Sequence, residues 1–144
     1  MTNSQCITRE AKTHADISQC FAVMHQLRPD YSHDAFIHRV IEQMAEGYRL
    51  AFLEVDGKAV SVTGFRIMNN LAWGKFLYVD DLVTDGSHRS MNYGSELLNW
   101  LKIEGRKLKC SQLHLDSGVQ RTDAHRFYAR EGMNMTCYHY AIIF

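Results

Sequence analysis

The sequence has no excess of charge of either sign. Sixteen Lys and Arg residues and sixteen Asp and Glu residues give a formal net charge of zero over 144 residues. A surface that binds nucleic acid is usually basic, because its affinity comes mainly from neutralising phosphates. The charge balance therefore argues against a nucleic-acid partner, but not against a small charged ligand that local groups hold.

Long apolar runs and leader-like segments are also missing. No run approaches the roughly 20 residues that a membrane-spanning helix needs, and the N-terminus lacks a basic segment followed by an apolar one. The four cysteines, Cys6, Cys20, Cys110 and Cys137, form no C-x-x-C pair. This usage is typical of free thiols in a reducing compartment rather than of a disulfide scaffold. We therefore expect a cytoplasmic protein with no membrane partner.

The histidines and cysteines show no pattern that indicates a metal site or a nucleophile. His33 and His38 are five residues apart, and neither H-E-x-x-H nor a Cys/His cluster occurs. None of the cysteines has a recognisable partner base in its surroundings. We expect no metal cofactor and no covalent cysteine chemistry.

The remaining composition, 46% apolar and 22% charged, is that of an ordinary globular protein. The length predicts one domain over residues 1–144, and the alternation of helical and strand patterns predicts a mixed α/β fold with a partly antiparallel sheet. The expected elements are a first strand or tail over 1–9, helices over 15–27 and 32–47, strands over 49–55, 58–68 and 75–84, a helix over 93–109, a strand over 111–117, a helix over 122–131 and a last strand over 136–144.

The segment 77–98 carries the strongest functional pattern. A β-rich run ends in a short polar turn that opens directly into an amphipathic helix, so backbone N–H groups at the positive end of a helix face a place where an anion can bind. The turn reads R-x-x-N-x-G from Arg89 to Gly94, which is neither a P-loop nor a dinucleotide fingerprint. Arg89 supplies charge, Gly94 permits close backbone approach, and Asn92 tolerates a left-handed turn. The alternative is a helix N-terminus with an incidental arginine.

Two segments together resemble the GNAT N-acetyltransferase superfamily. Asp80-Asp81-Leu82-Val83-Thr84 followed by Arg89-Ser90-Met91-Asn92-Tyr93-Gly94 is similar to the acetyl-CoA motif of that family, R/Q-x-x-G-x-G/A. The stretch 113–118, followed by Arg121, Ala124, Tyr128 and Gly132-Met133, is similar to its later strand and helix. The sequence departs from the family at Asn92, where the first glycine is usual, at Gly86, where proline is common, and at Arg121, where asparagine is common.

The resemblance implies a mostly antiparallel central sheet, splayed between its fourth and fifth strands and flanked by about four helices. It implies acetyl-CoA as co-substrate, with direct transfer to an amine in a ternary complex. The residues that it assigns to acetyl-CoA are Leu82, Val83, Thr84, Arg89, Ser90, Met91, Asn92, Tyr93, Gly94, Ser95 and Arg121. One amide around Leu82–Thr84 would serve as the oxyanion donor, and the others would pair with the pantetheine arm.

The same resemblance assigns the proton transfers. Tyr128 stands where similar enzymes keep the acid that protonates the leaving thiolate, although a tyrosine four residues after Ala124 is often a core residue. Asp80 and Asp81 are the nearest carboxylates to the expected reaction centre, and strand alternation places them on opposite faces. A salt bridge or a loop-anchoring hydrogen bond is the alternative role for both, and a water chain is the alternative base.

The acceptor cannot be read from the sequence beyond an amine of a small molecule or a peptide. Trp73, Tyr31 and Phe36 are candidates for its pocket, or else ordinary core aromatics. Two other functions stay open: a non-catalytic acyl-CoA-binding module, suggested by Asn92, and an interaction protein or homodimer that pairs strands through the segment 138–144.

Overall fold

The computed structural model describes residues 4–144. The chain divides into two compact units, Met1–His114 and Leu115–Phe144. The prediction that residues 1–144 form one domain therefore stays a prediction. The first three residues of the expected N-terminal strand or tail lie outside the described residues.

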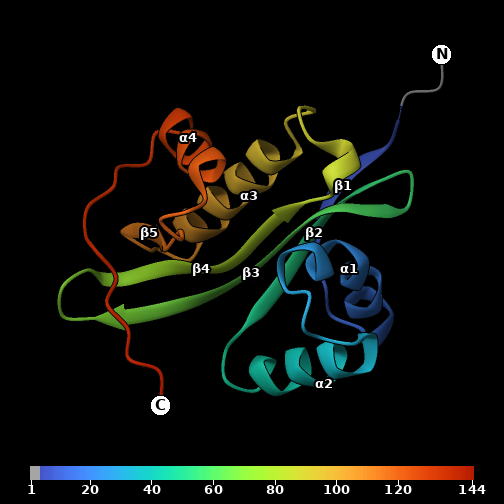
Figure 1. Cartoon of the computed structure of the whole chain (residues 1–144), viewed down its shortest axis with the longest axis horizontal. Helices are drawn as coiled ribbons and strands as arrows, with labels where there is room; N and C mark the ends of the chain where they lie inside the picture. The colour runs from blue at the N-terminus through green and yellow to red at the C-terminus, as the bar shows by residue number, and fades with distance from the viewer. Residues whose placement is uncertain (1–3) are drawn as a thin grey trace. The chain divides into compact units, whose positions relative to one another are not determined.

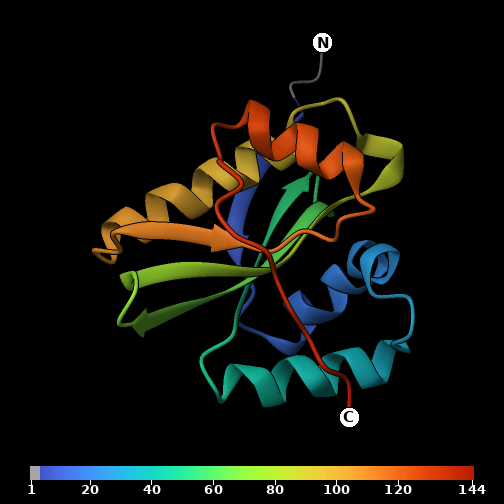
Figure 2. The ribbon, with the colours of Figure 1, turned by 60° about the vertical axis from the view of Figure 1, so that its left-hand side comes forward.

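A five-stranded sheet is the centre of the first unit (Figure 1). Its strands are β1 (Cys6–Glu10), β2 (Arg49–Val55), β3 (Lys58–Asn70), β4 (Gly74–Thr84) and β5 (Gln112–Leu115), in that spatial order. The first three pairings are antiparallel, whereas β5 runs parallel to β4 (Figure 2). The predicted α/β class with a mostly antiparallel sheet is confirmed, and the hairpin at Asp56-Gly57 forms because both residues adopt a positive φ.

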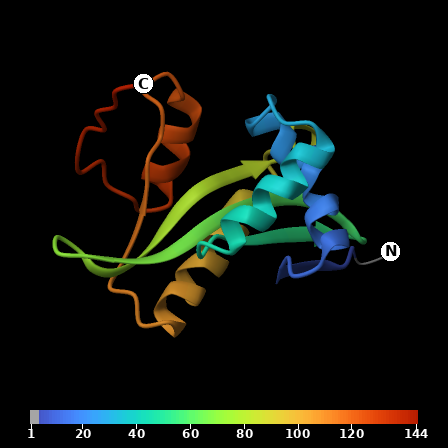
Figure 3. The ribbon, with the colours of Figure 1, turned by 90° about the horizontal axis from the view of Figure 1, so that it is seen from below.

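Helices cover both faces of this sheet. The helices α1 (His14–Leu27) and α2 (His33–Met44) pack on one face, and α3 (Tyr93–Lys107) packs on the other (Figures 2 and 3). Capping explains where the first two begin: Thr13 and Asp16 form a capping box, and the Ser32 hydroxyl accepts from the N–H of Ala35 at 3.2 Å. The predicted stop before Pro29 is confirmed.

The core lies between the sheet and these helices. On the α1–α2 side it includes Cys20, Met24, Phe36, Ile37, Val40, Leu50, Phe52 and Val62, and α3 contributes Leu97, Leu98 and Leu101. All of these side chains are at most 5% exposed. Burying a residue of this kind contributes roughly 1.5–3 kcal/mol, so the two apolar layers hold β3 and β4 firmly in place.

The second unit contains α4 (Thr122–Arg130) and a C-terminal segment without regular structure. Gly132 ends the helix at a φ of 85°, and the N–H of Met133 bonds the carbonyl of Tyr128 at 3.0 Å. The predicted strand over 136–144 is wrong, since these residues are in no strand and are exposed. An apolar, β-rich sequence forms a strand only where a neighbouring strand supplies ladder hydrogen bonds.

Among residues 4–144, the four cysteines are free, and no helix is long and apolar enough to cross a membrane. The same residues contain no cluster of three or more His, Cys, Asp or Glu side chains arranged to hold a metal ion.

Candidate functional site

The turn between β4 and α3 is anchored at its start by Asp85. Its side chain accepts hydrogen bonds from Gln26 Nε2 at 2.9 Å and from His88 Nδ1 at 2.8 Å, and its backbone N–H bonds the carbonyl of Val60. The bond from Gln26, with those from His88 and Ser87, lowers the pKa of the Asp85 carboxyl. The turn therefore leaves the sheet at a fixed point, through the short 3-10 helix η1 (Gly86–His88).

Beyond η1 the backbone forms a cradle at the N-terminus of α3. Ser90 and Asn92 both adopt left-handed conformations, at φ values of 71° and 63°, and the Asn92 side chain makes no cap to the helix. Within the described residues, no backbone hydrogen bond of regular geometry is donated by the N–H groups from Arg89 to Gly94. Asn92 thus takes the conformation that glycine would take, and open amides converge at the positive end of a helix dipole. An anionic diphosphate fits such a cradle.

The end of β4 offers amides at a free edge. The N–H of Asp85 points to β3. The carbonyls of Asp81 and Val83 also point to β3, where they accept hydrogen bonds from the hydroxyl groups of Thr63 and Ser61, respectively. Backbone groups alternate along a strand, so the N–H groups of Leu82 and Thr84 point away from β3. The neighbouring β5 begins where Ser111 N–H bonds the carbonyl of Lys75, and it is only four residues long. Among residues 4–114, no strand therefore pairs with the outer edge of β4 at Leu82 and Thr84.

This geometry divides the three amides that the sequence grouped together. Leu82 and Thr84 can donate to a ligand that lies along the edge, whereas the N–H of Val83 faces β3. An extended chain with alternating donors and acceptors, such as a pantetheine arm, would match that spacing.

A β-bulge interrupts β4 at Asp80. Gly64 is opposite Asp81 and Phe65 is opposite Val79, so Asp80 has no partner residue in β3. A bulge breaks the alternation of side chains along a strand. The prediction that Asp80 and Asp81 lie on opposite faces is wrong, because both line the same cavity.

Asp81 is held by two side chains of this cavity. The Tyr48 hydroxyl donates to Oδ2 at 2.8 Å, and Arg28 Nε donates to Oδ1 at 2.9 Å. Burial, followed by the charge of Asp81, raises the pKa of Tyr48 well above its ordinary value, so the phenol stays a donor. Tyr48 crosses Gly64 to reach Asp81: a Cβ at Gly64 would lie 1.7 Å from the phenol oxygen.

Asp80 is held less completely. Arg66 Nε donates to Oδ2 at 2.9 Å, but Oδ1 is buried and has no hydrogen-bond partner among the described residues. Burial raises the pKa of the Asp80 carboxyl, and the opposing effect of Arg66 only partly offsets it. A carboxylate with one unpaired oxygen and a raised pKa is a better proton acceptor than an ordinary surface aspartate.

The cavity itself has a volume of about 320 Å³ and lies wholly within the first unit. Its walls come from the end of α1, from α2, from the entrance to β2 and from β4. They consist of Met24, Arg28, Tyr31, Phe36, Arg39, Val40, Gln43, Tyr48, Tyr78, Asp80 and Asp81. Two of the three aromatic residues expected at an acceptor pocket, Tyr31 and Phe36, are therefore in this wall.

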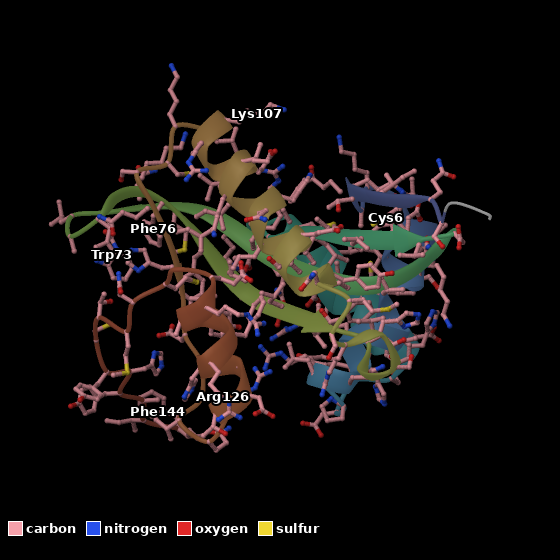
Figure 4. The ribbon with its side chains drawn as sticks, turned by 90° about the horizontal axis from the view of Figure 1, so that it is seen from above. Cys6, Trp73, Phe76, Lys107, Arg126 and Phe144 are labelled. Carbon is pink, nitrogen blue, oxygen red and sulfur yellow. The ribbon has the colours of Figure 1, made fainter. Side chains whose placement is uncertain are left out.

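Trp73, the third, lies elsewhere. Its ring stacks on His114 with centroids 3.5 Å apart and meets Phe76 edge to face. Figure 4 places Trp73 and Phe76 at the hairpin end of the sheet, opposite Cys6. Trp73 is thus a packing residue of the β3–β4 hairpin.

The second unit carries Tyr128 and Arg121. Tyr128 is half-buried on α4, and burial raises the pKa of its phenol although Arg121 lowers it. Arg121 is exposed at the N-cap of α4 and makes no side-chain cap. The phenol therefore keeps its proton at neutral pH, as a general acid must.

The family model described as the acetyltransferase (GNAT) family matches residues 12–133, which span both units. The chain belongs to the GNAT acetyltransferase family. Among curated relatives of this GNAT protein, the aminoalkylphosphonate N-acetyltransferase of Salmonella typhimurium (strain LT2) is 29% identical over 133 residues, covering 88% of this chain and 84% of the relative. The N-acetyltransferase YhdJ of Bacillus subtilis (strain 168) is 29% identical over 112 residues, covering 77% and 79%.

Solved structures show the same fold. An aminoglycoside N-acetyltransferase, AAC(6')-Iy, in complex with CoA aligns with a TM-score of 0.84 at 16% identity, covering 99% of this GNAT protein and 95% of that chain. The glucosamine-6-phosphate N-acetyltransferase of Arabidopsis thaliana aligns with a TM-score of 0.77 at 20% identity, covering 97% and 99%. At these identities the alignments establish architecture.

Sequence reasoning missed most of the cavity of this GNAT protein. Arg28 and Tyr48 bond to the aspartates of β4 from positions 33 to 53 residues away in the chain. No local pattern connects either of them, or Arg39, to the aspartates. The sequence signals for the cavity are Asp80-Asp81 within a β-rich run, since adjacent carboxylates in a strand need partners, and the aromatic residues Tyr31 and Phe36.

Proposed function

We propose that this protein transfers the acetyl group of acetyl-CoA to a primary amine of a small molecule, directly and in a ternary complex. One observation carries the proposal: Asp80, whose Oδ1 is buried and has no hydrogen-bond partner among residues 4–144, is a residue of the cavity wall two positions from the open amide of Leu82 on the same strand. A proton acceptor and an oxyanion donor are thereby held on one rigid element. Family membership and the two N-acetyltransferase relatives support the proposal.

Acetyl-CoA would supply a thioester, whose acetyl carbon is the electrophile. The amides from Arg89 to Ser95, with the Arg89 side chain, would hold the diphosphate. Met91, Asn92 and Tyr93 would contribute through their backbone, and Arg121 is a further candidate from the second unit. The edge amides of Leu82 and Thr84 would bind the pantetheine arm and stabilise the charge that develops on the carbonyl oxygen.

The proton balance assigns roles to two side chains. An ammonium loses two protons when it becomes an amide, and the thiolate released from the broken C–S bond takes up one. Asp80 accepts the proton that must leave before the nitrogen attacks, and passes it to solvent. Tyr128 donates a proton to the sulfur and is reprotonated as the amide nitrogen loses its second proton. Asp81, bonded to Arg28 and Tyr48, positions Asp80 rather than exchanging protons.

The direct test is a titration with CoA followed by a transfer assay. We expect calorimetry to show saturable binding of CoA, and acetyl-CoA with a panel of primary amines to release free thiol. Binding without thiol release across the panel would favour the alternative of a non-catalytic acyl-CoA module. No heat from CoA with folded protein would contradict the proposal altogether.

Replacing Tyr128 with phenylalanine should lower kcat by about 10²-fold, the smaller end of the range for general acid catalysis. The ring is kept, so CoA affinity should change by less than a factor of about two. Tyr93→Phe is the matched control, because it removes a phenol at the diphosphate cradle without removing the assigned acid. Loss of CoA binding in Tyr128→Phe would instead make Tyr128 a structural residue.

A further inference from the structure

The charges in the wall of the cavity are not all balanced within it. Arg28 is bonded to Asp81 through its guanidinium, with contacts of 2.8 and 2.9 Å. Arg66, outside the wall, balances Asp80. Arg39, the remaining charged side chain of the wall, forms no ion pair with another described lining residue.

The pairing of Arg39 outside the cavity is weak. Arg39 pairs with Glu42, one turn along α2, at 3.4 Å, and both side chains are more than half exposed. Exposed pairs of this kind contribute little and exchange readily. The guanidinium on α2 is therefore available to an anionic group that enters the cavity.

The β4 side of the cavity contains a hydrogen-bond acceptor that lacks a donor. Oδ1 of Asp80 is buried and has no hydrogen-bond partner in the part of the chain that the structure describes, and leaving such an acceptor unpaired is costly. An ammonium group donates up to three hydrogen bonds, so an amine bound here would satisfy that oxygen. The positive charge of the ligand would then face β4, and α2 would face the rest of the ligand.

The size and lining of the cavity restrict the part of the ligand that connects its ammonium to its anionic group. A volume of about 320 Å³ holds roughly ten waters, which corresponds to a compact molecule and not to a folded peptide segment. Tyr31, Phe36 and Val40 supply apolar surface between α2 and the sheet. A short carbon chain would pack on this surface.

We propose that the acceptor is a small zwitterionic amine, whose ammonium binds Asp80 and whose carboxylate or phosphonate binds Arg39. This inference rests on the proposed function and makes it more specific. The acceptors that fit this description share a primary amine separated from an anionic group by a few carbons. The relative that is named for aminoalkylphosphonates has this chemistry in its name, and Arg39 supplies a structural reason for it here.

The test compares amines that differ only in the charge of their far end. 2-Aminoethylphosphonate and β-alanine carry an anion, whereas ethanolamine and n-propylamine do not. We expect kcat/KM to be about 10- to 100-fold higher for the anionic pair, the range of a charge-assisted hydrogen bond. The phosphonate and carboxylate arms then show which anion the site prefers.

Arg39→Met keeps the length of the side chain and removes its charge. In this variant the ratio of kcat/KM between anionic and neutral amines should fall close to one, mainly because KM for the anionic amines rises. Arg39→Lys keeps a positive charge and should retain part of the preference for anionic amines. Arg106→Met is the matched control, because Arg106 is an exposed helical arginine of α3 outside the cavity wall. That variant should keep the full ratio.

A binding measurement separates this inference from the proposed function. Calorimetry with 2-aminoethylphosphonate alone needs no turnover, and Arg39→Met should weaken its binding at least tenfold. Equal kcat/KM for anionic and neutral amines in the wild-type protein would overturn the inference and leave acetyl transfer standing. Binding of 2-aminoethylphosphonate through Arg39 without thiol release would overturn acetyl transfer instead.

Discussion

Asp80→Asn should lower kcat by about 10³-fold, the middle of the range for a lost general base. Asparagine has nearly the same shape, and its carbonyl can still accept from Arg66, but it cannot take a proton from the amine. Because burial raises the pKa of Asp80, the folded protein disfavours the charged carboxylate, and stability falls as pH rises through that raised pKa. Removing the charge should therefore leave the Tm at neutral pH unchanged or slightly higher.

The pH profile supplies an independent check on the same residue. In the wild-type protein, log kcat/KM should rise with pH through an apparent pKa above the ordinary aspartate value of about 3.9, because only the ionised form of Asp80 accepts a proton. This limb should be absent from the residual activity of Asp80→Asn. Asp81→Asn is the matched control, and it should keep the limb. An Asp80→Asn enzyme with wild-type kcat would show that water or another group is the base.

Gly64→Ala should destabilise the protein by about 3 kcal/mol, at the upper end of the cost of overpacking a core. The new Cβ would lie 1.7 Å from the oxygen of Tyr48 and within 2.5 Å of two ring carbons. Tyr48 is 4% exposed and bonded to Asp81, so its ring has no free space to enter. Urea unfolding should show the loss, and acetyl transfer should fall because Asp81 loses a partner.

Two further variants test the cause. Gly105→Ala is the matched control, since its Cβ would meet Leu77 at an ordinary 3.6 Å, and alanine favours a helix interior by roughly 0.5–1 kcal/mol. This variant should be as stable as the wild type or more so. In a double-mutant cycle, Tyr48→Ala should make the second change, Gly64→Ala, nearly neutral. Additive losses would place the strain somewhere other than the Tyr48 ring.

Strand β4 shows most clearly where the structure departs from the pattern of its sequence. The run from Leu77 to Thr84 predicts a strand, and the structure confirms it. It does not predict the bulge, because a bulge arises from the register between β3 and β4, and register depends on residues of both strands. The two aspartates consequently share one cavity, and the predicted alternation fails at Asp80, the residue that we propose as the proton acceptor.

Features that depend on residues close together in the chain were predicted correctly from the sequence. Asn92 is left-handed as its residue type suggested, Ser32 caps α2, and Pro29 follows the end of α1. The final segment shows the converse case. Its apolar residues, from Tyr138 to Phe144, are mostly exposed and form no strand, because a β-rich sequence cannot make a ladder alone.

The sequence alone therefore determined the order of the elements up to α4, the open turn before α3 and membership of the acetyltransferase family, since each depends on neighbours within a few residues. Only the tertiary structure brought Arg39, Tyr48 and Asp80 to one cavity, and only it left one oxygen of Asp80 without a hydrogen-bond partner among the described residues. Those relations depend on packing between segments far apart in the chain, where side-chain shape and strand register, rather than local preference, set the distances.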